Sequence, residues 1–240
     1  MRPDLLKQLD IPMGEADAGF PSLGGGGDAY TFDSSLVTIY EPFQAPAEAI
    51  RALRTHIMAQ HVNEGRRALS VCAASPGVGC TFVATNLAVA LSQIGVKTLL
   101  IDGDLRNPSV DLVIRPPVIK AGLRQCLASP EHDFGGYVEP EVMPNLSIMY
   151  SGGPAPHPQE LLANDQFTAL MDYCLRDFDA TIVDTPAANS CSDARRISTV
   201  AGYSIIVARR NKSLVNDVKT LAGQLQGDHA RIVGTVLNEA

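Results

Sequence analysis

The chain has 240 residues, a formal net charge of −7 and five cysteines that form no Cys-x-x-Cys pair or Cys/His cluster. This length suits one α/β domain with some additional chain, and such a domain folds without disulfides or metals. Scattered basic residues argue against a nucleic-acid partner, and the lack of an apolar run of about 18 residues or of a signal-peptide core predicts a cytoplasmic protein.

Residues 1–45 differ in composition from the rest of the chain. They include four consecutive glycines at 24–27 and few aliphatic residues. Such a segment cannot bury enough apolar area to offset the entropy lost on ordering, so we expect a flexible N-terminal tail or linker. The run 36–40 would suit a short strand or a docking segment. The remaining residues, 46–240, are predicted to form one domain.

A helix is predicted from Ala47, because apolar residues recur there at helical spacing. Three charged residues, Glu48, Arg51 and Arg54, fall three apart along a different face from the apolar one. On spacing alone, these three indicate a solvated face with an ion pair between neighbouring turns. The apolar face consists of Ile50, Leu53, Ile57 and Met58.

From residue 68 onward, short apolar runs alternate with segments of helical periodicity. Wholly apolar strands alternating with helices predict an α/β fold, with a doubly wound, mostly parallel sheet between two layers of helices. Ligands bind such sheets at the carboxyl ends of the strands, so the loops after Ala74, Ile101 and Val183 form the candidate site. The predicted strands lie at 68–74, 97–102, 146–151, 180–184, 203–208 and 231–238, and the helices at 81–94, 159–175 and 214–225.

The first of these loops, residues 75–81, reads Ser-Pro-Gly-Val-Gly-Cys-Thr. Its glycines let successive backbone N–H groups point at an anion, and the following helix adds the positive end of its dipole. Thr81 stands where a hydroxyl would bind Mg²⁺, whereas Ala74 and Cys80 replace the first glycine and the lysine of the phosphate-loop pattern. By itself the loop would also suit an ordinary strand-to-helix turn.

The other two loops carry carboxylates. Asp102 and Asp104 follow one apolar strand, and Asp184 closes another. Carboxylates at a strand end suit Mg²⁺, which completes its coordination with water and phosphate oxygens, and Arg106 could contact phosphate. Each loop alone could be a polar turn, but the three together, in this order and each at a strand end, predict a nucleotide site.

Several segments resemble, in order, the motifs of the bacterial tyrosine kinases of capsule and exopolysaccharide synthesis, a family within the deviant P-loop ATPases. The segments are APAEAIRALRTHI, SPGVGCT, GGPAPHPQELLAN, VDTPAANSCSDA and VGTVLNEA, and the resemblance covers about residues 36–238. It implies a P-loop NTPase fold that binds ATP and Mg²⁺.

The resemblance assigns roles at the candidate site residue by residue. Asp102, Asp104 and Asp184 would take the catalytic, hydroxyl-activating role, and Thr81, Asp102 and Asp184 would hold the metal. The implied nucleotide-binding residues are Gly77, Val78, Gly79, Cys80, Thr81, Phe82 and Arg106.

The resemblance also implies partners. Glu48, Arg51 and Arg54 would mediate assembly of a homo-oligomeric ring, in place of the solvated face that spacing alone indicates. A separate membrane chain-length regulator, or polysaccharide co-polymerase, would complete the active site with its cytoplasmic tail. The chain would then lie in the cytoplasm, peripheral at the inner membrane through that partner.

Cys80 departs from the family, which has a lysine there that reaches the β- and γ-phosphates. A thiol is at best a weak neutral donor. By analogy with the loss of one preorganised donor, we expect a cost of ~3–4 kcal/mol in the transition state, roughly 10²–10³ in rate, and ~1.5–3 kcal/mol in ground-state binding. A thiol at a helix N-terminus could also be reactive, but a tolerated replacement is the simpler interpretation.

A second departure concerns tyrosines, since the six in this chain are dispersed and no tyrosine-rich tail follows Asn238. We therefore expect the family's usual autophosphorylation substrate to be lacking.

The leading hypothesis is a kinase-like subunit, or pseudokinase, that regulates polysaccharide polymerisation or export. The alternative is an active ATP-dependent protein-tyrosine kinase in which Lys212, Arg209 or Arg210 reaches the phosphates. A partitioning-type ATPase or a metal-cluster carrier is disfavoured, because the loop has no early signature lysine and the chain no Cys-x-x-Cys pair.

Overall fold

The computed structural model describes residues 22–23, 29–118 and 121–239. Most of the predicted tail, residues 1–21 and 24–28, lies outside the described residues. Among the described residues no helix has both the length and the apolar character that crossing a bilayer requires.

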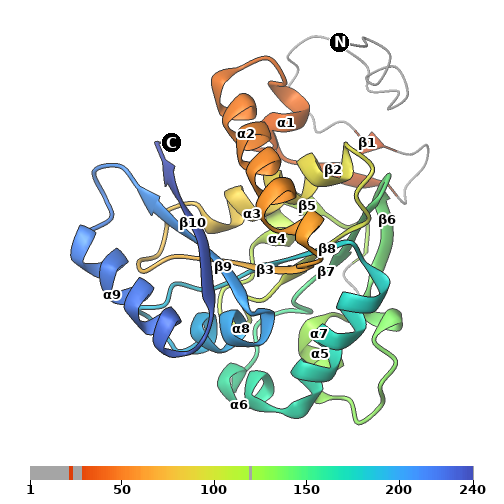
Figure 1. The fold of residues 1–240 in the computed structure, drawn as a ribbon. Helices are drawn as coiled ribbons and strands as arrows, with labels where there is room; N and C mark the ends of the chain where they lie inside the picture. The colour runs from red at the N-terminus through yellow and green to blue at the C-terminus, as the bar shows by residue number, and fades with distance from the viewer. Residues whose placement is uncertain (1–21, 24–28, 119–120, 240) are drawn as a thin grey trace.

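The core of the fold is a seven-stranded sheet with the order β10-β9-β3-β8-β4-β7-β6 (Figure 1). Its pairs are parallel except for β6 and β7, which are antiparallel. This confirms the predicted mostly parallel sheet. The strands are β3 (Ala68–Cys72), β4 (Thr98–Asp102), β6 (Glu139–Met143), β7 (Leu146–Met149), β8 (Ala180–Asp184), β9 (Tyr203–Arg209) and β10 (Arg231–Asn238).

Helices cover both faces of the sheet, because successive residues of each strand point to opposite sides. Leu100 of β4 packs in one cluster with Leu87 of α3, whereas Leu99 and Ile101 pack in another with Phe167 of α7. The three layers of the prediction are therefore confirmed (Figure 1). The helices are α1 (Val37–Tyr40), α2 (Ala45–Gln60), α3 (Cys80–Ser92), α4 (Val110–Val113), α5 (Leu123–Ala128), α6 (Pro158–Ala163), α7 (Asp165–Asp177), α8 (Asp193–Ala201) and α9 (Val215–Gly227).

The described part of the predicted linker packs against the domain. Strand β2 (Tyr30–Phe32) pairs with β1 (Ser22–Leu23) and with β5 (Ile114–Arg115) in a small antiparallel sheet. Phe32 and Leu36 are fully buried, and the buried Asn86 of α3 donates to the carbonyl of Ser35 at 2.9 Å. Residues 29–45 thus belong with the domain in the structure, and the run 36–40 contains the short helix α1 instead of a strand.

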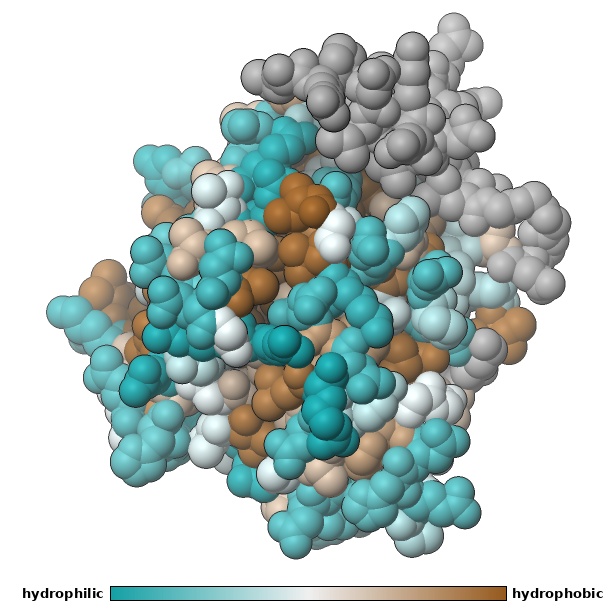
Figure 2. All heavy atoms as spheres, turned by 45° about the vertical axis from the view of Figure 1, so that its right-hand side comes forward, coloured by the Kyte–Doolittle hydropathy of each residue, from teal (hydrophilic) through white to brown (hydrophobic). Residues whose placement is uncertain are grey.

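Several other elements differ from the sequence prediction, and the short elements α4, β5 and α5 were not predicted. The expected helix over 159–175 is two helices, because the chain turns at Asn164, whose side chain accepts from the backbone N–H of Gln166 and starts α7. Helix α8 and the antiparallel edge strand β6 were not predicted; β6 has exposed polar residues and an irregular register, with Glu141 at a positive φ of 49°. On the face shown in Figure 2, hydrophobic side chains occur in small groups among hydrophilic ones.

Candidate functional site

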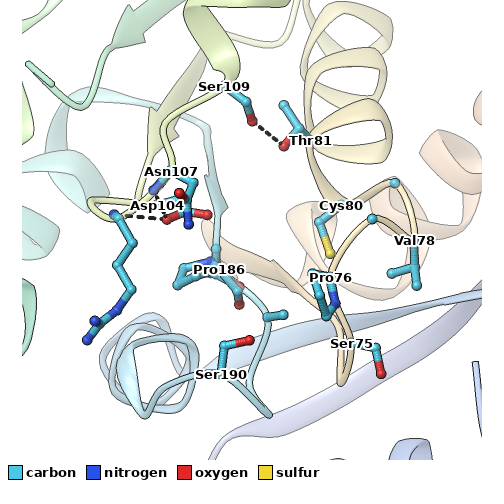
Figure 3. A pocket seen from close by; sticks show the side chains of 15 residues that line it. Ser75, Pro76, Val78, Cys80, Thr81, Asp104, Asn107, Ser109, Pro186 and Ser190 are labelled. Atoms are coloured by element: carbon cyan, nitrogen blue, oxygen red, sulfur yellow. Dashed lines mark hydrogen bonds between the residues drawn. The ribbon is translucent and has the colours of Figure 1, made fainter. Parts of the chain in front are cut away.

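The loops that follow β3, β4 and β8 meet at one edge of the sheet, because these strands are neighbours in the order β3-β8-β4. They enclose a cavity of about 420 Å³. Figure 3 shows Cys80 and Val78 on one side, Asp104 and Asn107 across from them, and Pro186 and Ser190 between. The lining residues are Ser75, Pro76, Gly77, Val78, Gly79, Cys80, Thr81, Asp104, Arg106, Asn107, Ser109, Thr185, Pro186, Ala187 and Ser190.

The loop over residues 75–81 has the backbone of an anion cradle. Gly77 and Gly79 have φ of 66° and 97°, a left-handed conformation that glycine adopts without strain. Gly79 is the N-cap of α3, and no side chain among the described residues caps that end of the helix. The first N–H groups of α3 are therefore available to an anion, which the helix dipole also favours.

Side chains at the carboxyl ends of β9 and β10, and just after β9, donate hydrogen bonds to the carbonyl oxygens of this loop. Lys212 Nζ donates to the Gly77 oxygen at 2.8 Å, and Arg209 Nη1 donates to the same oxygen at 3.3 Å. Asn238 Nδ2 donates to the Val78 oxygen at 3.0 Å. With these carbonyls bonded to side chains, the loop keeps its N–H groups for a ligand.

Cys80 brings no charge to the cavity that it lines. Burial, with the neighbouring Asp184 as a second cause, raises the pKa of the Cys80 thiol well above its ordinary value. The thiol is therefore neutral, and the lowered pKa that a reactive cysteine needs is not found here.

The buried carboxylates lie side by side beneath the cavity. Asp102 and Asp184 are paired in register on β4 and β8, and both are at most 1% exposed. Thr81 Oγ1 donates to Asp184 Oδ2 at 2.6 Å and lies 2.8 Å from Ser109 Oγ. Both oxygens of Asp102 accept backbone N–H groups of the β4–α4 loop. Burial raises the pKa of Asp102 to about 7 and, with the adjacent Asp102 charge, raises the pKa of Asp184 well above its usual range.

The loop after β4 brings both Asp104 and Arg106 to the cavity, but Asp193 holds the guanidinium of Arg106. Asp104 Oδ1 accepts the N–H groups of Arg106 and Asn107 at 3.0 and 2.8 Å. The Arg106 guanidinium forms two bonds, of 2.8 and 3.3 Å, with Asp193, the first residue of α8, which is 1% exposed. The expected phosphate contact of Arg106 is thus replaced, in this structure, by an ion pair.

The arrangement fits Mg²⁺ bound together with a phosphate ligand. Asp184 Oδ1 is buried and has no hydrogen-bond partner among the described residues, and the Thr81 hydroxyl lies beside it. No group of three or more His, Cys, Asp or Glu in the described chain could hold an ion by itself. One or two carboxylates, with water and phosphate oxygens supplying the rest, is the coordination that Mg²⁺ prefers. Asp102 is less available than predicted, since backbone groups occupy both of its oxygens.

Two predicted sets of residues lie away from the cavity. The side chain of Phe82 packs in a cluster with Ala47, Ile50 and Ala90, and Phe82 is not among the residues that line the cavity. On α2, Glu48 and Arg51 form an exposed ion pair of 2.7 Å, while Arg54 Nη1 donates to the Ala90 oxygen at 3.3 Å and so ties α2 to α3.

The residues that shape the site but were not predicted as part of it include Ser109, Asp193 and Asn238. Asp193 was quoted only as part of the VDTPAANSCSDA motif, and Asn238 only as the end of the last strand. Their contacts with Arg106 and Val78 span 87 and 160 residues of chain. No local pattern reports contacts of that range.

No known family profile matches the chain. It is 26% identical over 206 residues to the putative tyrosine-protein kinase CapB of Staphylococcus aureus, covering 86% of this chain and 90% of that protein. Identity is 28% to the tyrosine-protein kinase Wzc of Salmonella typhimurium and 30% to the putative tyrosine-protein kinase AmsA of Erwinia amylovora. In both of these pairs the match covers 85% of this chain but only 28% of the longer relative.

Solved structures show the same fold. The kinase domain of the Escherichia coli tyrosine kinase Etk superposes with a TM-score of 0.80 at 26% identity, covering 100% of this chain and 88% of that one. The chimerical protein CapA2B2 gives a TM-score of 0.79 at 28% identity, with 99% and 98% covered. The septum site-determining protein MinD of Pyrococcus horikoshii, complexed with Mg-ADP, gives 0.60 at 22% identity, with 72% and 70% covered. At that identity, the likeness to MinD concerns the fold alone.

Proposed function

We propose, from the premise that the chain is a homologue of the bacterial tyrosine-protein kinases with a P-loop ATPase fold, that it is a nucleotide-binding subunit with impaired phosphoryl transfer. Its pathway would be capsule or exopolysaccharide synthesis and export, where it would regulate polymerisation or export through a membrane chain-length regulator.

One observation carries this proposal: the cradle and the carboxylates are in place, but none of the residues that line the cavity offers an available cation. Among the lining residues, all of them in the described part of the chain, Arg106 is the only basic one, and it is bonded to Asp193. Cys80 is neutral where a lysine would stand. Phosphoryl transfer depends on positive groups that stabilise the charge developing on the phosphate. The site therefore favours binding over transfer.

The residues present would hold ATP and Mg²⁺ as follows. Backbone N–H groups of residues 77–81 would surround the phosphates, and Thr81 with Asp184 would orient the metal. When bound, Mg²⁺ would bridge and neutralise phosphate oxygens. Asp104 is the carboxylate that lines the cavity, so we assign to it the contact with an attacking hydroxyl.

The relatives support a partner for this chain. The match covers 90% of CapB but only 28% of Wzc. The same kind of domain therefore makes up nearly all of one relative and is joined to more sequence in the other. For this chain, a separate membrane protein would take the place of the additional sequence that is joined to the domain in Wzc. Assembly of copies through the exposed pair Glu48 and Arg51 on α2 belongs to the same proposal.

The competing function is an active tyrosine kinase, and the contact of Lys212 with the P-loop favours it. The test measures phosphotyrosine formed on a tyrosine-containing peptide with ATP and Mg²⁺, with and without the cytoplasmic segment of the candidate partner. The proteins compared are the wild type, Cys80→Lys and Asp104→Asn. Asp104→Asn is a matched control, because its amide oxygen can still accept the N–H groups of Arg106 and Asn107.

We expect the wild type to transfer phosphate roughly 10²–10³ times more slowly than Cys80→Lys, the effect of one preorganised charged donor. A wild-type rate equal to that of Cys80→Lys, and abolished by Asp104→Asn, would show an active kinase and overturn the impaired-subunit proposal.

A further inference from the structure

The loop between β9 and α9 brings two positive charges onto the backbone of the P-loop. Lys212 Nζ and Arg209 Nη1 lie 2.8 and 3.3 Å from one oxygen, that of Gly77. Gly77 in turn lines the cavity. The ammonium of Lys212 thus contacts a lining residue of the pocket whose own lysine position holds Cys80, without itself lining the pocket in this structure.

The local fold directs Lys212 to this place. Strand β9 is the direct neighbour of β3, so their carboxyl ends lie together. Past the end of β9 the chain turns sharply: Asn211 has a φ of 58°, and Lys212 N–H donates to the Arg209 oxygen at 3.2 Å. Gly77 supplies the room, since a Cβ there would lie 2.6 Å from Lys212 Nζ.

The two cations are incompletely compensated. Both share one neutral acceptor, and like charges that converge on a single oxygen repel each other. In the described chain the Lys212 ammonium has no carboxylate partner, whereas the adjacent Arg210 pairs with Glu239 at 3.2 Å. An anion bound at the rim would relieve the repulsion and would accept a stronger, charge-assisted bond than a carbonyl does.

We propose that Lys212 supplies, from the β9–α9 loop, the phosphate-binding cation that is absent at position 80. Its ammonium exchanges the Gly77 oxygen for a non-bridging oxygen of a nucleoside polyphosphate in the cavity, and Arg209 keeps the bond to Gly77. The long, flexible stem of lysine allows this exchange. The inference rests on the proposed nucleotide-binding function and deepens it, because it concerns ground-state affinity and not the rate of transfer.

The first experiment measures the Kd of Mg·ADP by calorimetry for the wild type and three variants. Lys212→Met removes the charge but keeps much of the stem, Lys212→Arg keeps a charge, and Lys219→Met removes the same charge from the exposed surface of α9. We expect Lys212→Met to weaken binding about tenfold, the effect of one charged hydrogen bond. Lys212→Arg should stay within about threefold of wild type, and Lys219→Met within about twofold.

A double-mutant cycle separates a phosphate contact from a role in shaping the loop. Cys80→Lys restores a cation inside the cavity and should tighten Mg·ADP binding. If Lys212 performs the missing lysine's task, Lys212→Met should cost less than about threefold in the Cys80→Lys background, because the phosphate already has its cation.

Each other outcome contradicts the inference. A Kd within twofold of wild type for Lys212→Met would show that Lys212 contacts no phosphate. An equal loss in both backgrounds would assign to Lys212 a structural role only. Binding by Cys80→Lys but not by the wild type would show that Lys212 does not replace the missing cation. If neither binds, the proposed nucleotide-binding function fails as well, which distinguishes that failure from the others.

Discussion

Arg106 and Lys212 are both basic side chains beside the same cavity, and they differ in what holds them. Arg106 bonds through two nitrogens to the buried carboxylate of Asp193, whereas Lys212 donates a single bond to the neutral carbonyl of Gly77. Arg106 was predicted as a phosphate ligand because it follows two aspartates in a loop at a strand end. Lys212 lies 135 residues from its contact and was only an alternative.

The difference shows that nearness to a pocket does not make a cation available to a ligand. Releasing Arg106 would leave a carboxylate unpaired at 1% exposure, which is costly in a poorly solvated place. Releasing Lys212 leaves an oxygen that Arg209 already contacts. Lys212, whose contact contributes less to stability than that of Arg106, is therefore the better candidate for binding phosphate.

The largest expected effect tests this contrast through stability. Arg106→Met should lower the free energy of unfolding by about 2–3 kcal/mol, because Asp193 stays buried without its partner. Lys212→Met should change it by less than about 0.5 kcal/mol, as for other exposed charges. Urea denaturation at pH 7.5 measures both. Equal losses would show that the two cations are held alike and would remove the contrast.

A second test concerns Asp102, a buried carboxylate that, unlike Asp193, accepts backbone N–H groups and no cation of the described chain. It asks how the protonation of Asp102 affects stability. Its pKa of about 7 in the folded state lies above the ordinary 3.8, so the folded protein retains a proton that the unfolded chain loses. This group's contribution to stability therefore falls as pH rises from about 4 to about 7. His61 acts in the opposite direction: burial lowers its pKa from 6.5 to about 4, so its contribution rises with pH over that window.

Between pH 4.5 and 6.5 the contributions of Asp102 and His61 oppose each other, whereas Asp184, whose pKa is also raised, acts in the same direction as Asp102. Asp102→Asn should be less stable overall, because an amide cannot accept all the backbone N–H groups that Asp102 accepts. Relative to the wild type, its stability should rise with pH, by about 2 kcal/mol across this window. Urea denaturation at four pH values checks the slope. Parallel curves for the two proteins would contradict a raised pKa at Asp102.

The smallest expected effect comes from releasing Arg106. Asp193→Asn keeps the shape of the side chain but removes its charge, so the guanidinium should become free to contact phosphate. We expect about threefold tighter binding of Mg·ADP by calorimetry, a fraction of one charged hydrogen bond. In the Arg106→Met background the same substitution should have no effect on affinity. A gain that persists there would come from something other than Arg106.

The architecture could be predicted because its signals are local. Short apolar runs such as 68–72 and 180–184 can be buried only inside a covered sheet, and each ends at a glycine-rich or acidic loop. Because parallel strands share one carboxyl edge, the loops after Ala74, Ile101 and Val183 were expected at one place, and residues of all three line the cavity.

What the sequence left undetermined depends on side-chain direction and strand order. Asp102 and Asp104 are two apart, and both accept backbone N–H groups of their loop, yet Asp102 is buried and Asp104 lines the cavity. Lys212 reaches Gly77 only because β9 lies next to β3, an order that the alternation of strands and helices does not fix. The division at Asn164 was missed because α6 and α7 continue one apolar pattern across a single capping residue.

Strand β10 lies at the edge of the main sheet, with β9 as its only neighbour among the described strands. Asn238, its last residue, holds the Val78 carbonyl of the P-loop. We therefore expect the docking of this edge strand to be linked to the affinity of the cavity for the proposed nucleotide, and such linkage is reciprocal. A protein that bound along this edge would alter how firmly nucleotide is held. Bound nucleotide would, to the same degree, alter how firmly the edge accepts that protein.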